Sequence, residues 1–153
     1  MQTFSPADRA RGLLLGAMVA SLLCAATTCD SPVRFEVRGD LKSGVAFRVY
    51  DAQKEDRQVQ ADQVVVGELH GDEIWRLEGH AAIRELWYGK PIEGLTSTLE
   101  PHPLERGKSY YIVVQGGDRW RGGYYGSFAF AVDIEGRVGP APLKVGEVGS
   151  LEE

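Results

Sequence analysis

The sequence predicts an all-β protein, an antiparallel two-sheet sandwich of about seven or eight strands that is preceded by a signal peptide. Apolar residues recur with a period of two from residue 32 onward, which is typical of strands with one buried face. Glycine, proline and acidic residues interrupt this alternation at short intervals, as turns do in sandwiches and small barrels. The prediction is therefore a signal peptide over residues 1–28 and one β-sandwich domain over 29–153.

The N-terminal segment has the parts of a secretory signal. Arg9 and Arg11 precede an apolar run from Leu13 to Ala26, and small or polar residues follow it. The run is shorter than the ~20 residues that a membrane-spanning helix needs. We therefore expect export across a bacterial membrane.

Cys29 follows this run directly, and residues 9–30 resemble a bacterial lipoprotein signal. The resemblance implies cleavage before Cys29 and lipidation of its thiol. Cys29 would then be the only cysteine of the mature chain, so no internal disulfide could form. The predicted location is the periplasmic side of the cell envelope, held on the membrane by the lipid. The alternative is cleavage after Ala26, which would release a soluble periplasmic or secreted protein.

Composition points to a bacterial source and argues against one class of partner. The chain contains no Asn, and its 12 Arg outnumber its 5 Lys, as a GC-rich genome would produce. Its formal net charge is −5, with the basic residues scattered singly. Nucleic acid is not an expected partner, because an acidic surface repels the phosphate backbone.

The strands are expected in regular succession. In the first, Val33, Phe35 and Val37 alternate with polar residues, and the turn-rich stretch 39–44 leads into a second strand over 45–50. Six further stretches are predicted as strands: 58–66, 73–78, 83–88, 109–115, 127–134 and 143–148.

A short motif before the strand at 109–115 gives the architecture more detail. Leu104, Gly107 and Tyr110 have the spacing L-x-x-G-x-x-Y, which resembles the corner of fibronectin type III and related immunoglobulin-like domains. The resemblance implies that Tyr110 packs its ring and bonds its hydroxyl to nearby backbone. The whole chain also resembles uncharacterised bacterial lipoproteins with a single immunoglobulin-like domain, a likeness that brings no function with it.

No motif in the chain predicts catalysis. The serines lack the Gly-x-Ser-x-Gly elbow of hydrolases. Glu68 and His70 lie in an acidic stretch beside a predicted turn, and strand alternation would place both on one face. Two ligands do not make a zinc site, which needs three or four. We therefore predict a protein that is not an enzyme and has no metal or cofactor. The rival hypothesis is a periplasmic metal-binding protein or hydrolase with its site around Glu68 and His70.

The segment 116–126 is the strongest candidate for a binding site. It connects two predicted strands, so it would be a loop at one end of the sandwich, where recognition loops are often found. It is rich in glycine and in the residue types enriched at binding hot spots. The predicted function is binding of a protein or envelope component, and the predicted contact residues are Trp120, Arg121, Tyr124 and Tyr125. The alternative is that these aromatic residues fold back over the sandwich and that the glycines serve only the turn.

Overall fold

The computed structural model describes residues 31–118 and 122–142, and these residues form one β-sheet of nine strands. The strands are β1 (Ser31–Asp40), β2 (Gly44–Asp51), β3 (Val59–Glu68), β4 (Glu73–Ile83), β5 (Glu85–Trp87), β6 (Leu95–Leu99), β7 (Ser109–Asp118), β8 (Gly122–Val132) and β9 (Val138–Pro140). The described residues contain no helix.

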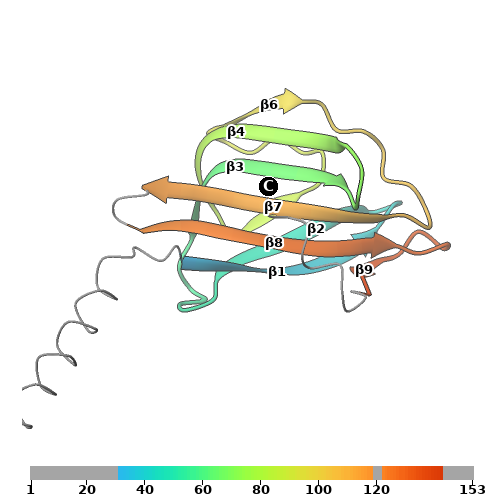
Figure 1. The fold of residues 1–153 in the computed structure, drawn as a ribbon, viewed down its shortest axis with the longest axis horizontal. Helices are drawn as coiled ribbons and strands as arrows, with labels where there is room; N and C mark the ends of the chain where they lie inside the picture. Colours follow the sequence, from blue (N-terminus) through green and yellow to red (C-terminus); the bar gives the residue numbers. More distant parts are fainter. Residues whose placement is uncertain (1–30, 119–121, 143–153) are drawn as a thin grey trace, which may run out of the picture.

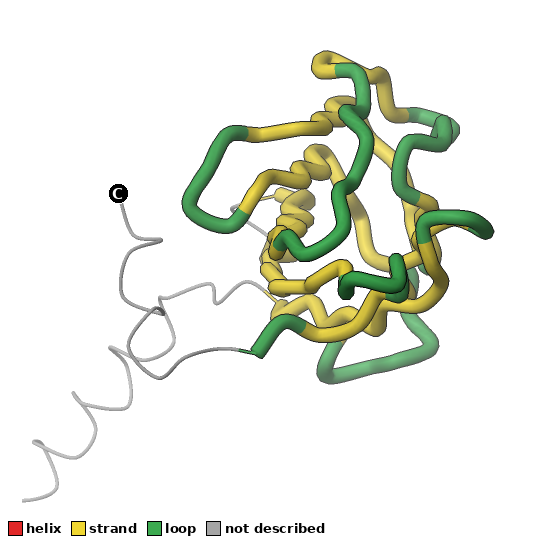
Figure 2. Tube along the Cα trace, turned by 90° about the vertical axis from the view of Figure 1, so that its right-hand side faces the viewer, coloured by secondary structure: helices red, strands yellow, loops and turns green. Residues whose placement is uncertain are grey.

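The sheet is continuous and mixed. Its order is β5-β2-β1-β8-β7-β3-β4-β6, and β9 pairs with the C-terminal end of β8, residues 130–132. Every pairing is antiparallel except that of β1 with β8, which is parallel and spans two residue pairs, Ser31 with Tyr124 and Pro32 with Tyr125. Figures 1 and 2 show the strands curling around a common centre. The all-β prediction is thus confirmed. The predicted purely antiparallel arrangement is wrong, because β1 and β8 pair in parallel within one continuous sheet.

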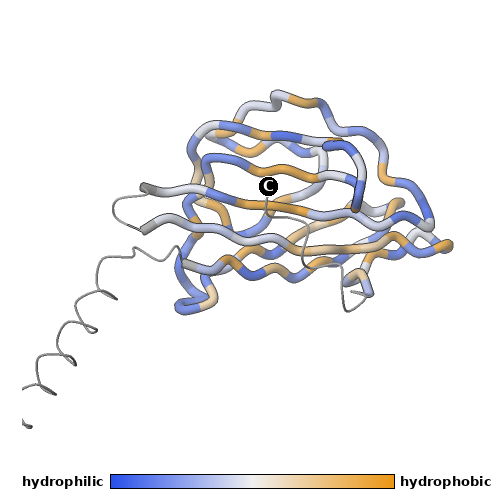
Figure 3. Tube along the Cα trace, viewed as in Figure 1, coloured by the Kyte–Doolittle hydropathy of each residue, from blue (hydrophilic) through white to orange (hydrophobic). Residues whose placement is uncertain are grey.

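The interior of the curl is the hydrophobic core, and period-two alternation places the side chains in it. In β1, Val33 and Phe35 are buried while Arg34 and Glu36 are exposed. Hydrophobic and hydrophilic positions accordingly alternate along the strands in Figure 3. Burying one large apolar side chain contributes about 1.5–3 kcal/mol. The largest fully buried side chains are Trp75, Tyr110, Phe47, Phe130, Leu86 and Ile112.

The expected corner around Tyr110 is present. The Tyr110 ring is buried and stacks on Phe130 with a centroid distance of 5.5 Å. Its hydroxyl accepts a hydrogen bond of 2.8 Å from the backbone N–H of Glu105. Gly107 has a φ of +77°, which a residue with a Cβ adopts at a cost. The corner therefore fixes how the chain enters β7.

Several strand boundaries differ from the prediction. The predicted strand at 83–88 is divided, because β4 ends at Ile83 on β3 whereas β5 pairs with β2 on the other side of the curl. Strand β6 was not predicted. Strand β8 begins at Gly122, and the predicted strand at 143–148 lies outside the described residues.

Candidate functional site

A groove of about 250 Å³ lies where the β7–β8 hairpin passes the start of β3. Its lining combines a carboxylate, an amide, glycine backbone and two phenols: Asp62, Gln115, Gly116, Gly117, Gly123, Tyr124 and Tyr125. Two of the four predicted contact residues, Tyr124 and Tyr125, are therefore part of one concave surface.

Gly116 allows the hairpin to approach β3 closely. A Cβ at this position would lie 2.3 Å from the carbonyl oxygen of Gln60 and 2.6 Å from the backbone nitrogen of Asp62. Real Cβ atoms do not come so near to backbone, so a side chain at Gly116 would force the strands apart. This glycine shapes the floor of the groove by allowing close packing. The sequence pattern had predicted only that it forms part of a turn.

Asp62 is held at an irregularity in the sheet. The pairing of β3 with β4 skips Asp62 on one strand and Gly79 and His80 on the other. The Asp62 Oδ2 atom accepts a hydrogen bond of 3.1 Å from the backbone N–H of Gly117, and its Oδ1 lies 2.6 Å from Nδ1 of His80. The carboxylate is thus oriented from two sides beside the groove.

A row of polar side chains continues from the groove across the outer face of the sheet. Gln115 donates a hydrogen bond of 2.6 Å to Gln63, and Gln63 donates one of 3.3 Å to Glu78. Arg76 donates to the same Glu78 carboxylate at 3.1 Å. These bonds keep the Gln115 amide in position at the rim of the groove.

The two tyrosines occupy different environments. Tyr124 is partly buried and packs against the hydrophobic core, whereas Tyr125 is 48 % exposed. Both lie on β8, because the ladder between β7 and β8 continues to the pair Asp118 and Gly122. The prediction of a long loop over 116–126 is therefore wrong for these positions, because β7 and β8 stay paired to the hairpin end.

Three other predicted site residues lie outside the described residues. These are Trp120 and Arg121, in the connection between β7 and β8, and Cys29, two residues before β1. A search of residues 31–118 and 122–142 for membrane-spanning helices finds none.

Glu68 and His70 do not lie on one strand face. Strand β3 ends at Glu68, and His70 stands in the following turn with a φ of +63°. The Lys108 ammonium lies 3.2 Å from the Glu68 carboxylate and 3.1 Å from that of Glu105. Hydrogen bonds to Glu105 and then Glu68 raise the pKa of Lys108, so Glu68 faces a persistent positive charge. Among residues 31–118 and 122–142, no three His, Cys, Asp or Glu side chains gather as metal ligands would.

No motif pointed directly to Asp62. It lies inside a predicted strand, and its position at the groove depends on the pairing irregularity and on β7, which is far away in the chain. The one local hint is that the alternation of polar and apolar residues breaks at Asp62 and Gln63, two polar residues in succession, as it does at a β-bulge.

Comparison of the chain with protein-family models, with curated proteins and with solved structures gives no match.

Proposed function

We propose that this chain is an exported, lipid-anchored protein of the bacterial cell envelope, and that its β domain is a non-enzymatic binding or assembly domain. The observation that carries the proposal is the exposed Tyr125 beside the groove. An aromatic ring next to oriented polar groups is a common composition of recognition surfaces. The lipoprotein-like segment before Cys29 supports the location.

We also propose that the fold is an immunoglobulin-like or fibronectin type III-like sandwich. Two features support this reading. The strands β5, β2 and β1 form one antiparallel group, whose only ladder to the other strands is the two parallel pairs of β1 with β8, apart from a single bridge between Asp40 and Arg137. The Tyr110 hydroxyl bonds to the backbone five residues upstream, as in the corner of such domains.

The binding surface can be tested by site-specific photo-crosslinking in living bacteria. The photoreactive amino acid p-benzoylphenylalanine replaces Tyr125 in one variant and Ile134 in the matched control. Both residues are exposed, but Ile134 follows the opposite end of β8. We expect a crosslinked product from position 125 and none from position 134. Equal products at both positions, or none at either, would contradict binding through this groove.

The proposed anchor has its own test, the intact mass of the mature chain recovered from membranes. We expect the mass of residues 29–153 plus a diacylglycerol and an acyl group. An unmodified chain that starts near Thr27 would refute the anchor and leave a soluble protein with a free Cys29 thiol.

A further inference from the structure

We propose that the envelope component met by this site is a lipid surface: the end of the domain with Tyr125 rests on the headgroup region of the membrane that holds Cys29. The inference rests on the proposed function and names the partner of the same site. It is based on the position of the start of β1, which lies beside Tyr124 and Tyr125 of β8.

The chain leaves very little length between the anchor and the groove. Strand β1 begins at Ser31, two residues after Cys29. At up to about 3.6 Å per residue, the Cα atoms of Cys29 and Ser31 lie within about 7 Å of each other. Ser31 pairs with Tyr124, and neighbouring strands lie about 5 Å apart. Tyr124 is thus held within about 12 Å of the residue that would carry the lipid.

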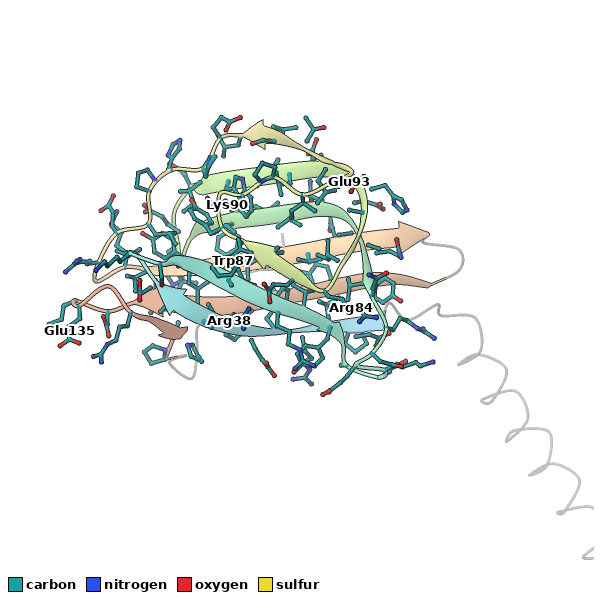
Figure 4. All side chains as sticks on the ribbon, turned by 180° about the vertical axis from the view of Figure 1, so that it is seen from behind. Arg38, Arg84, Trp87, Lys90, Glu93 and Glu135 are labelled. Atoms are coloured by element: carbon teal, nitrogen blue, oxygen red, sulfur yellow. The ribbon has the colours of Figure 1, made fainter. Side chains whose placement is uncertain are left out.

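The direction of β8 sets which end of the domain is near the membrane. Strand β8 runs parallel to β1, away from this junction, and leads to the turn that contains Ile134 and Glu135. The seven steps from Tyr125 to Val132 cover about 24 Å, more than three times the reach of the two-residue tether. Figure 1 places the β7–β8 hairpin at one end of the sheet and β9 toward the other, and Figure 4 shows Arg84 and Glu135 at opposite ends.

The chemistry of the near end suits a membrane interface. Tyrosine is enriched at the headgroup level, where its ring is in an apolar setting and its hydroxyl in a wet one. Tyr125 is 48 % exposed there.

The charges of the neighbouring β2–β3 loop cancel, so they do not repel an anionic bilayer. The loop follows Asp51, which pairs with Val33 near the start of β1. Its charged residues are two cations and two anions, Lys54, Glu55, Asp56 and Arg57. A loop without net charge is more easily accommodated beside anionic lipid than the chain as a whole, whose charge is −5.

The test uses the full lipidated protein in the outer leaflet of vesicles made of phosphatidylethanolamine and phosphatidylglycerol. With Cys29 acylated and Cys24 removed with the signal segment, Tyr125→Cys supplies a unique thiol for a fluorescent nitrobenzoxadiazole label. Ile134→Cys is the matched control, because Ile134 is 81 % exposed and lies beyond the far end of β8. Gln58→Cys labels an exposed residue at the near end if Tyr125→Cys does not fold.

We expect the label at position 125 to lose its quenching by aqueous iodide and to be quenched by a lipid with a nitroxide on its headgroup. The label at position 134 should behave in the opposite way. Equal iodide quenching at both positions, on protein whose mass includes the lipid, would overturn the membrane contact and leave the anchor standing. A mass without lipid would refute the anchor and the contact together. A photo-crosslink from position 125 to a protein in place of lipid would keep the binding site and refute the lipid surface.

Discussion

The hydroxyl of Tyr110 can be removed with almost no other change to the molecule. Tyr110→Phe keeps the ring, which is 1 % exposed and stacked on Phe130. It deletes the acceptor of the 2.8 Å hydrogen bond from the Glu105 N–H. Such a bond contributes about 0.5–1.5 kcal/mol, and an unsatisfied buried partner costs about 1–3 kcal/mol. Because the hydrogen bond is only partly buried, we expect a loss of about 1 kcal/mol in the free energy of unfolding.

Equilibrium unfolding in urea, followed by tryptophan fluorescence, measures this loss. Trp75 is 1 % exposed and so reports the opening of the core. With a slope of about 2 kcal/mol per molar urea, the midpoint should fall by about 0.5 M. Tyr125→Phe is the control, since it removes a hydroxyl from a half-exposed ring and should change stability by less than about 0.5 kcal/mol. If both variants unfold at the wild-type midpoint, the hydroxyl of Tyr110 does not stabilise the corner and the reasoning is refuted.

Two further predictions concern the floor of the groove and the far turn. Gly116→Ala should destabilise the fold by about 1–3 kcal/mol, because its Cβ would meet the backbone of β3, whereas Gly139→Ala, which meets nothing within 4 Å, should not. The urea midpoints of the two variants are compared with that of the wild type. Equal midpoints would show that β3 and β7 accommodate a Cβ at position 116 without cost. Hydrogen bonds from the backbone of Arg137 and Glu135 hold the pKa of Asp133 below its ordinary value of 3.8. A lowered pKa means that this stabilisation is present above the unfolded-state pKa of about 3.9 and is lost as the pH falls through the folded-state value. Urea midpoints from about pH 6 to about pH 3 should therefore fall more steeply for the wild type than for Asp133→Asn, and parallel curves would contradict the role of the carboxylate.

The alternation of apolar and polar residues was sufficient to predict the approximate positions of most strands. Alternation along β1 and β2 identified the core residues Val33, Phe35, Val45, Phe47 and Val49, because one face of each strand is largely wet. It was wrong for Ala46, which is fully buried where β2 pairs with β5. It failed for β6, whose Thr96, Ser97 and Thr98 offer no apolar contrast on an edge strand. It failed also for the start of β8, where glycines that permit close strand contact have the same composition as a loop.

The candidate site was predictable only in its residue types. Aromatic composition identified Tyr124 and Tyr125, but their place on a strand beside the start of β1 depends on a parallel pairing between residues more than ninety positions apart. The place of Asp62 in the groove likewise depends on a distant contact, because its partner Gly117 lies 55 residues further along the chain. The alternation proposed for Glu68 and His70 broke at the end of β3, because nothing in the local pattern fixes where a strand stops.

The short parallel junction between β1 and β8 also has a mechanical meaning. Tension that enters the domain through its N-terminal residue acts along the axis of β1. The eight residue pairs between β1 and β2 then carry the load together in shear, while the two pairs with β8 lie at the loaded end. Strands loaded in shear resist separation more than strands that open one bond at a time. A pull on this end would therefore have to slide β1 along β2 before the first strand could leave the sheet.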